Sequence, residues 1–339
     1  MRLYKEMKMN KIGKLKNFIK SMPFVGNIAL KIYSIFNLIK PRGQYWEYDF
    51  KAKKFDRLIR NVASLINDRG YKVVINSDSI YIVLKNGIKF YWIPRDPYSL
   101  LGMPLRGSFE PECTYLVTKL VKKGNIVFDI GANFGWYSCH FAQLVGEAGK
   151  VHIFEPTNAI EELKNNLILN RFMKKCILNK VALGEKEEVK TLFIPQKLGT
   201  AFASLCEHSY SGDKKSVKIS VPVKKLDDYV SLNRIKKIDF IKMDVEGGEY
   251  FVLKGAENVL KQYSPVVMLE LQDVHTKYFG YSPKELISYL EKFEFVLYEI
   301  DEKNFGSLKK VNLFHNTRNY NFLAVKNVDI LKKRGITIN

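Results

Sequence analysis

Cysteine is scarce in this chain. Its four cysteines among 339 residues are Cys113, Cys139, Cys176 and Cys206, and no two of them form a C-x-x-C pair. Scattered single cysteines exclude a disulfide framework and a zinc site built from cysteine pairs. We therefore expect a protein of a reducing compartment, with a cytoplasmic location.

Long apolar runs are also missing. The sequence has no stretch of about eighteen or more apolar residues, which excludes a membrane-spanning helix. No continuous apolar core follows the basic start of the chain, so no signal peptide is expected. Internal repeats and low-complexity segments are absent as well. The chain is nevertheless 46% hydrophobic, which is enough for one large domain plus an extension.

Acidic residues are outnumbered by basic ones. Asp and Glu total 35 against 55 Lys and Arg, and residues 1–60 alone carry 15 basic against 4 acidic residues, a balance of +11 (15 − 4). In that stretch Ile32, Ile35, Phe36 and Ile39 recur at helical spacing on one face. The segment can be a helix packed on the main domain, a membrane-surface contact through residues 1–45, or a nucleic-acid arm. Nucleic acid is the least favoured partner, because the usual recognition signatures are missing. The sequence leaves the oligomeric state open.

Strand-like runs alternate with amphipathic helical segments along most of the chain. Strands are expected at residues 126–130, 151–155, 177–181, 238–243, 266–270, 295–300 and 321–325. Such alternation predicts an α/β fold with a mostly parallel sheet covered on both faces. A small antiparallel meander is expected at 71–93. We divide the chain into an N-terminal basic helical extension with this meander, 1–95, and a main domain, 96–339.

Residues 126–137 combine a buried strand, a tight turn and the start of a helix. Gly131 and Gly135 lie four positions apart in this turn, where glycines let a ligand approach the backbone closely. A dinucleotide-binding turn, G-x-G-x-x-G, would have glycine where Asn133 stands, so a pyrophosphate is not expected. Asp129 closes the strand and is placed to receive N–H or ammonium donors.

A second acid follows at the spacing of a ribose ligand. Glu155 lies 20 residues after Gly135 (155 − 135), at the end of the next apolar run. An acid at that place can accept both hydroxyls of a ribose. Together with Asp129 and the missing pyrophosphate turn, it favours a nucleoside that carries an amino acid, S-adenosylmethionine (SAM). The alternative is a plain strand-to-helix turn with Glu155 as a helix-start acid.

Four further acids lie at or just after the ends of two later strands. Asp244, Glu246 and Glu249 belong to Met-Asp-Val-Glu-Gly-Gly-Glu, and Glu270 ends the next strand. Ligands of such sheets bind outside the carboxyl ends of the strands. The acids can position a substrate hydroxyl and the SAM methyl group, hold a hard cation such as magnesium, or, for Glu249, stabilise the next helix through its dipole. Spacing alone does not establish a metal, and no metal ligand is assigned.

The chain resembles the FkbM family of SAM-dependent methyltransferases. Five motifs in family order carry the resemblance, over roughly residues 98–326: Val127-Phe-Asp-Ile-Gly-Ala-Asn-Phe-Gly-Trp-Tyr137, Phe154-Glu-Pro156, Asn179-Lys-Val-Ala-Leu-Gly184, Lys225-Leu-Asp-Asp228 and Ile238-Asp-Phe-Ile-Lys-Met-Asp-Val-Glu-Gly-Gly-Glu249. Gly248 stands where family members often have alanine. The resemblance implies a class I methyltransferase fold, Rossmann-like, with a mostly parallel seven-stranded sheet.

The resemblance also implies SAM as cofactor and a methyl transfer, usually to the hydroxyl oxygen of a small-molecule, sugar or glycan acceptor. Together with the turn and acid spacing it predicts these cofactor-binding residues: Asp129, Gly131, Asn133, Gly135, Glu155, Val181, Ala182 and Asp244.

Catalysis of such a transfer consists mostly of aligning the acceptor oxygen with the methyl carbon and sulfur, together with removal of the hydroxyl proton. The candidate bases are Asp244, Glu246, Glu270 and His275. An RNA methyltransferase is the first alternative, although no Asn/Asp-Pro-Pro-Tyr motif is present. A non-catalytic SAM-binding or scaffold protein is the second.

Overall fold

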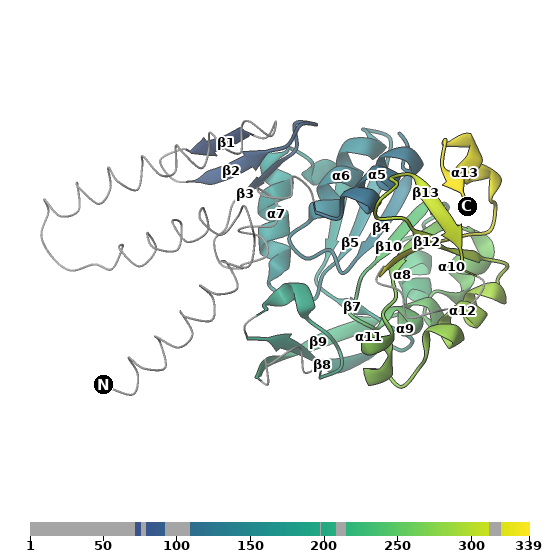
Figure 1. The fold of residues 1–339 in the computed structure, drawn as a ribbon. Helices are drawn as coiled ribbons and strands as arrows, with labels where there is room; N and C mark the ends of the chain where they lie inside the picture. The colour runs from purple at the N-terminus through teal and green to yellow at the C-terminus, as the bar shows by residue number, and fades with distance from the viewer. Residues whose placement is uncertain (1–71, 76–78, 92–108, 197, 208–214, 312–319) are drawn as a thin grey trace, which may run out of the picture. The chain divides into compact units, whose positions relative to one another are not determined.

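The computed structural model describes residues 72–75, 79–91, 109–196, 198–207, 215–311 and 320–339. These residues fall into two compact units (Figure 1). The second unit comprises Ile88–Tyr91 and Ser108–Asn339 and contains all of the predicted site residues. The domain boundary predicted at residue 95 and the basic segment 1–45 lie outside the described residues, so both stay predictions.

The first unit contains two strands of the expected meander. β1 (Lys72–Ile75) pairs antiparallel with β2 (Ile80–Val83), with Lys72 opposite Val83. The third strand of this region, β3 (Lys89–Tyr91), belongs to the second unit. There the backbone N–H groups of Lys89 and Tyr91 donate to the side chains of Asn170 and Asn166 at 2.8 and 2.9 Å.

The second unit is built on one sheet of nine described strands. The predicted strands are present as β4 (Ile126–Ile130), β5 (Lys150–Phe154), β6 (Cys176–Asn179), β10 (Phe240–Met243), β11 (Val266–Glu270), β12 (Val296–Ile300) and β14 (Asn321–Val325). They lie side by side in the order β6-β5-β4-β10-β11-β14-β12, and the pairs from β6 to β11 are parallel. This seven-stranded part confirms the predicted α/β class.

Two further strands extend the sheet from seven to nine. β13 (Ser307–Lys310) pairs antiparallel with β12, and β15 (Thr337–Ile338) pairs parallel with β13. The sequence pattern does not predict these two strands, because they are short and have no apolar run of their own. They lie at the edge farthest from β4 and leave the arrangement around the glycine turn unchanged.

Helices cover both faces of the sheet (Figure 1). The helices are α5 (Pro111–Leu120), α6 (Trp136–Val145), α7 (Ala159–Leu169), α8 (Leu226–Leu232), α9 (Glu249–Lys254), α10 (Glu257–Gln262), α11 (Asp273–Tyr278), α12 (Pro283–Glu291) and α13 (Asp329–Lys333). Phe128 and Ile130 of β4 point into a core shared with α8, α9, α10 and α12. Since successive strand residues point to opposite faces, Asp129 faces the other side, toward α6, where Ser138 bonds it.

A smaller sheet holds a β-hairpin. β8 (Glu188–Pro195) pairs antiparallel with β9 (Ser216–Lys224) over eight residue pairs, from Glu188 opposite Val223 to Pro195 opposite Ser216. The two-residue strand β7 (Ala182–Leu183) pairs parallel with β9. The sheet buries its own small core of Ala182, Leu192, Val221 and Val223.

A break separates the two consecutive helices α9 and α10. Gly255 lies at the break, where a Cβ atom would lie 2.0 Å from the carbonyl oxygen of Gly184. Helix and loop approach each other too closely there for any side chain.

Among the described residues, no helix is long and apolar enough to cross a membrane.

Candidate functional site

The turn after β4 packs against the turn after β10. Gly131 has a φ of 77°, and a Cβ at this position would lie 1.8 Å from the carbonyl oxygen of Asp244. The sequence predicts that this glycine lets a cofactor approach the backbone closely. In the structure the backbone of Asp244 occupies the space beside the Gly131 Cα atom. Gly131 is therefore required by the packing of the two turns.

Glu155 follows β5 and is buried beside the same turn. Its Oε2 atom accepts the backbone N–H of Asn133, and its Oε1 atom accepts that of Thr157, both at 2.8 Å. Asn133 has a φ of 49°, a conformation that asparagine adopts more readily than most residues. Burial raises the pKa of Glu155. Each carboxylate oxygen has one lone pair beyond these contacts, so Glu155 can still accept two hydroxyl groups.

Asp129 is fully buried between β4 and α6. Its Oδ2 atom accepts the Ser138 hydroxyl at 2.5 Å, whereas its Oδ1 atom has no hydrogen-bond partner among the described residues. Burial raises the pKa of Asp129 to about 6, against the opposing effects of Lys242 and Ser138. A buried carboxylate oxygen without a hydrogen-bond partner is stabilised by a nearby cation.

Lys242 neutralises part of this charge, and the sequence analysis did not single it out. It lies opposite Asp129 in the β4–β10 ladder and forms an ion pair with Asp244 at 3.0 Å. Burial lowers the pKa of Lys242, but Asp244, Asp129 and Glu110 outweigh that effect and raise the pKa above its usual value. A lysine within the apolar strand Phe-Ile-Lys-Met was the signal that could have identified it.

Glu110 is the second functional candidate that the sequence analysis missed. It precedes α5 with a φ of 43° and accepts the Tyr137 hydroxyl at 2.5 Å and the Asn321 side-chain amide at 3.1 Å. Burial raises the pKa of Glu110 to about 7, and the charge of Asp244 adds to the shift. The residue lies outside every motif, and only the fold places it against β10.

Asp129, Glu110 and Asp244 therefore share a single lysine, Lys242. Three carboxylates around one ammonium group leave an excess of negative charge at the ends of β4 and β10. The site thus fits SAM, because a sulfonium and an α-ammonium group complement such an excess.

The turn after β10 holds Glu246 in an uncommon conformation. Glu246 has a φ of 53°, and its carbonyl oxygen accepts the Ser204 hydroxyl at 2.9 Å. The Tyr281 hydroxyl donates to the carbonyl oxygen of Gly247 at 2.9 Å, and the Val245 N–H donates to Glu249 at 2.9 Å. A left-handed glutamate persists only where its surroundings fix it, so these contacts aim its side chain.

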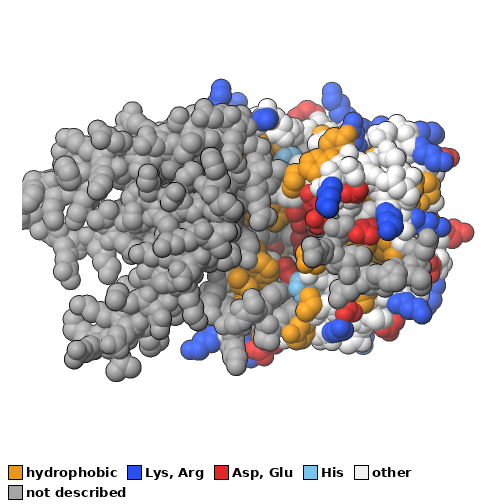
Figure 2. Space-filling model, viewed as in Figure 1, with side chains coloured by type: hydrophobic (Ala, Val, Ile, Leu, Met, Phe, Trp, Pro, Cys, Tyr) orange, Lys and Arg blue, Asp and Glu red, His pale blue; other side chains and the backbone are white. Residues whose placement is uncertain are grey.

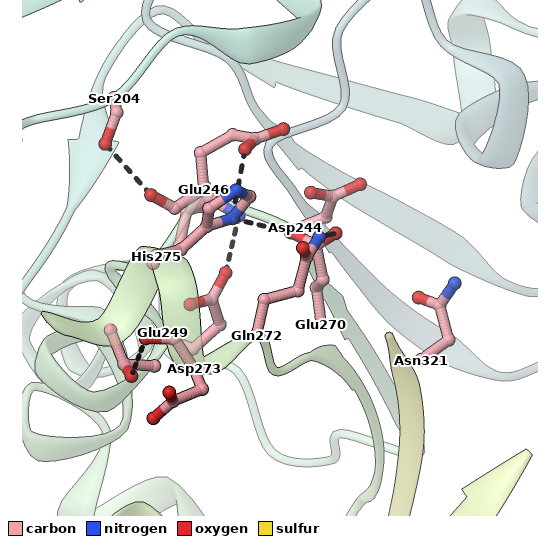
Figure 3. Close-up of polar contacts among 12 residues, drawn as sticks. Ser204, Asp244, Glu246, Glu249, Glu270, Gln272, Asp273, His275 and Asn321 are labelled. Carbon is pink, nitrogen blue, oxygen red and sulfur yellow. Dashed lines mark hydrogen bonds and ion pairs between the residues drawn. The ribbon is translucent and has the colours of Figure 1, made fainter. Parts of the chain in front are cut away.

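Glu246, Glu270 and His275 converge beside this turn (Figure 3). The His275 Nδ1 atom lies 3.4 Å from the Glu246 Oε2 atom and 3.8 Å from the Glu270 Oε2 atom. The three side chains come from the turn after β10, the end of β11 and helix α11. All three are candidate bases predicted from the sequence, and the structure brings them together next to Asp244 (Figure 3).

Glu249 begins α9, as the helix-start interpretation expected. It is buried, and burial raises its pKa to about 8, with the charge of Glu270 adding to the shift. Its contact with the Val245 N–H gives it a structural role in the turn.

Val181 and Ala182, predicted to contact the cofactor, follow β6 on the far side of β5. Val181 packs against the main core, and Ala182 is buried in β7. Their assignment to the cofactor stays a prediction. In Figure 2 acidic side chains gather near the centre of the view, with a histidine and hydrophobic side chains close by.

Comparison with known proteins identifies the family. Residues 129–297 match the family described as the Methyltransferase FkbM domain. A guanylate kinase of Helicobacter hepaticus is 31% identical over 90 residues, which are 26% of this chain and 44% of that protein. The chain thus spans less than half the length of this curated relative.

Two solved structures are similar at low identity. The structure of methyltransferase FkbM from Methylobacillus flagellatus has a TM-score of 0.40 and 16% identity, covering 67% of this chain and 52% of that one. An rRNA methylase from Streptococcus thermophilus has a TM-score of 0.35 and 14% identity, covering 63% and 91%. The chain thus spans about half the length of the FkbM structure.

Proposed function

Since residues 129–297 carry its domain, this chain belongs to the FkbM methyltransferase family, and we propose that it methylates a hydroxyl oxygen of a small-molecule, sugar or glycan acceptor. The family assignment gives a class I SAM-dependent methyltransferase. The oxygen specificity and the acceptor class are the proposal.

In this proposal the Glu155 carboxylate accepts the two ribose hydroxyls of SAM, for which its oxygens have lone pairs left. The ribose is the middle of the cofactor, so its two ends extend along the sheet edge in opposite directions. The adenine end then lies toward Val181 and Ala182, and the methionine end toward Asp129 and Asp244. The excess negative charge around Lys242 supports this direction.

SAM supplies a methyl group that its sulfonium already activates, so the chain has to position the acceptor and remove one proton. Asp244 is the proposed proton acceptor. Its side chain is 27% exposed, whereas Asp129 and Glu155 are buried. The Lys242 ammonium holds it in place from the buried side.

The observation that carries the oxygen specificity is the Glu246–Glu270–His275 cluster beside Asp244. Its carboxylates can accept a hydrogen bond from a neutral hydroxyl group, whereas they would repel an anionic acceptor. A hydroxyl acceptor is therefore the chemistry that the site complements best.

The test is incubation of the full chain with SAM labelled in its methyl group and with fractionated cell glycans, lipids, small molecules and RNA. We expect the label in a non-RNA fraction, in a form that survives mild alkali as a methyl ether does. Label that ribonuclease releases would instead establish the RNA methyltransferase alternative. Tight SAM binding without transfer to any fraction would favour the scaffold alternative.

Residues 1–45 add a proposal about location, motivated by the basic balance of residues 1–60 and the apolar face at Ile32, Ile35, Phe36 and Ile39. We propose that this segment contacts an anionic membrane surface near a lipid-linked acceptor. The competing interpretation, a helix packed on the main domain, predicts no such contact.

A further inference from the structure

We propose that Glu246, Glu270 and His275 together bind one divalent transition-metal ion, which in turn binds the acceptor hydroxyl. The inference deepens the proposed function and rests on it for the role of the metal, but the metal site itself follows from the geometry of three side chains.

The distances fit a metal centre. Each residue offers one ligand atom, and these three atoms all lie within 4.8 Å of one another. The separations of 3.4 Å to Glu246 and 3.8 Å to Glu270 both start from the same nitrogen, Nδ1 of His275. Ligands at about 2.1 Å from a tetrahedral ion lie about 3.4 Å apart, so the side chains need to move little to close around one.

The local charge balance also favours a cation. The side chains of Glu246, Glu270 and His275 are only 10%, 15% and 9% exposed, so solvent screens the two carboxylates poorly. The Glu270 Oε2 atom is buried and has no hydrogen-bond partner among the described residues. One Nδ1–H group cannot point at two carboxylates 3.4 and 3.8 Å away at once, whereas an ion between the three atoms contacts all of them.

Neighbouring residues fix the carboxylate of Glu270 and the backbone of Glu246. Gln272 donates to the Oε1 atom of Glu270 at 2.6 Å, which leaves the Oε2 atom directed toward His275. The Ser204 hydroxyl donates to the carbonyl oxygen of Glu246 and so holds the left-handed backbone of Glu246 in place. Hydrogen bonds that orient metal ligands in this way are a regular feature of metal sites.

The donor set selects the class of metal. One imidazole nitrogen and two carboxylate oxygens suit Zn²⁺ or Mn²⁺ better than Mg²⁺ or Ca²⁺, which prefer oxygen ligands throughout. Three protein ligands also leave a coordination position for an acceptor, as in catalytic metal sites.

The ion lowers the pKa of the bound acceptor hydroxyl, so a weak base beside it is sufficient. Asp244, which Figure 3 draws next to the cluster, takes the proton and passes it to solvent. The acceptor oxygen then forms its bond to the methyl carbon while the carbon–sulfur bond breaks and its electron pair stays on sulfur. One proton is released for each methyl group transferred.

The first test measures metal binding without SAM. The full chain, stripped with EDTA, is titrated with Mn²⁺ followed by the EPR signal of the free ion, and with Zn²⁺ by calorimetry. We expect one ion per chain, and binding weaker by about tenfold or more in each of Glu246→Gln, Glu270→Gln and His275→Gln. Glu257→Gln, which alters an exposed acid on α10, is the control and should bind as the unaltered chain does.

Binding by all three variants as tight as that of the unaltered chain would overturn the site, as would an unaltered chain that binds neither ion. Should Glu246→Gln fail to fold because its turn is strained, Glu270→Gln and His275→Gln decide the question. Circular dichroism identifies such a case.

The second test separates the metal site from the proposed function. We expect the stripped protein to bind SAM but to transfer no methyl group until Mn²⁺ or Zn²⁺ is added. Full methyl transfer after EDTA treatment would refute the metal proposal and leave the proposed methyltransferase function intact. Metal binding without methyl transfer to any hydroxyl acceptor would refute the proposed function and leave the proposed metal site intact.

Discussion

Gly131 and Asp244 lie back to back, and a Cβ atom on Gly131 would fall 1.8 Å from the carbonyl oxygen of Asp244. This contact joins the turn that follows β4 to the turn that follows β10. Glu155, the proposed ribose ligand, lies beside the first turn, and Glu246 belongs to the second.

Gly131→Ala should therefore destabilise the whole domain, with loss of SAM binding as a consequence. The methyl group collides with backbone and the φ of 77° is strained for alanine, so we expect about 2–4 kcal/mol of lost stability in urea unfolding. Gly124→Ala is the matched control, because its φ is 80° but nothing lies within 4 Å. It should cost only about 1 kcal/mol. Equal losses in the two variants would contradict the contact.

Glu155→Ala should weaken SAM binding by about 1–3 kcal/mol, because it removes the proposed acceptors of both ribose hydroxyls. Calorimetry measures the affinity, and Glu161→Ala on the exposed side of α7 is the control. Glu155 also receives two backbone N–H groups, so thermal unfolding must be measured beside the affinity. Unchanged SAM affinity in a folded variant would refute the assignment.

SAM binding should depend on pH through Glu110. Its pKa is raised to about 7, so it is mostly neutral at pH 6 and mostly ionised at pH 8. The ionised form attracts a cationic ligand and the neutral form does not. Affinity should thus rise by up to about tenfold between pH 6 and pH 8 and level off above that.

Glu110→Gln should reduce this pH dependence without abolishing binding, because glutamine can still accept the Tyr137 hydroxyl while Asp129, with its pKa raised to about 6, accounts for the remaining dependence near pH 6. Calorimetry at several pH values checks both statements. A variant with the same pH profile as the unaltered chain would show that another group titrates.

Asp244→Asn should lower turnover far more than SAM affinity, because the proposal gives Asp244 the acceptor proton. Asparagine keeps the shape of the side chain but cannot take that proton and no longer pairs with Lys242. Turnover and SAM dissociation constants are compared in the same preparation. If both fall in proportion, Asp244 is a cofactor ligand only.

Deletion of residues 1–45 tests the membrane proposal. The full chain should sediment with anionic liposomes, less so at high salt, because each basic residue near such a surface contributes about 1 kcal/mol. The deleted form should stay in solution, remain folded and bind SAM. An insoluble deleted form, together with a full chain that ignores liposomes, would show that the segment is packed on the domain.

The sequence by itself determined the architecture of the main domain and half of the site. Apolar runs at regular intervals specify the seven strands from β6 to β12 in the main sheet, because burial on both faces demands them. Gly131, Asn133, Gly135 and Glu155 were identifiable because a strand, a turn and the next strand bring them together at fixed local spacing. The strands β13 and β15, which lie beyond β12, were missed because these short strands have little apolar sequence of their own.

Only the tertiary structure decided the other half. Glu246, Glu270 and His275 are separated by 24 residues (270 − 246) and then 5 (275 − 270), and the parallel pairing of β10 with β11 is what brings them within one cluster. Glu110 lies before β4, with the whole of helix α5 between them. Its raised pKa results from burial and from the charge of Asp244. Spacing along the chain carries local geometry, whereas proximity across the sheet and desolvation arise only when distant segments pack together.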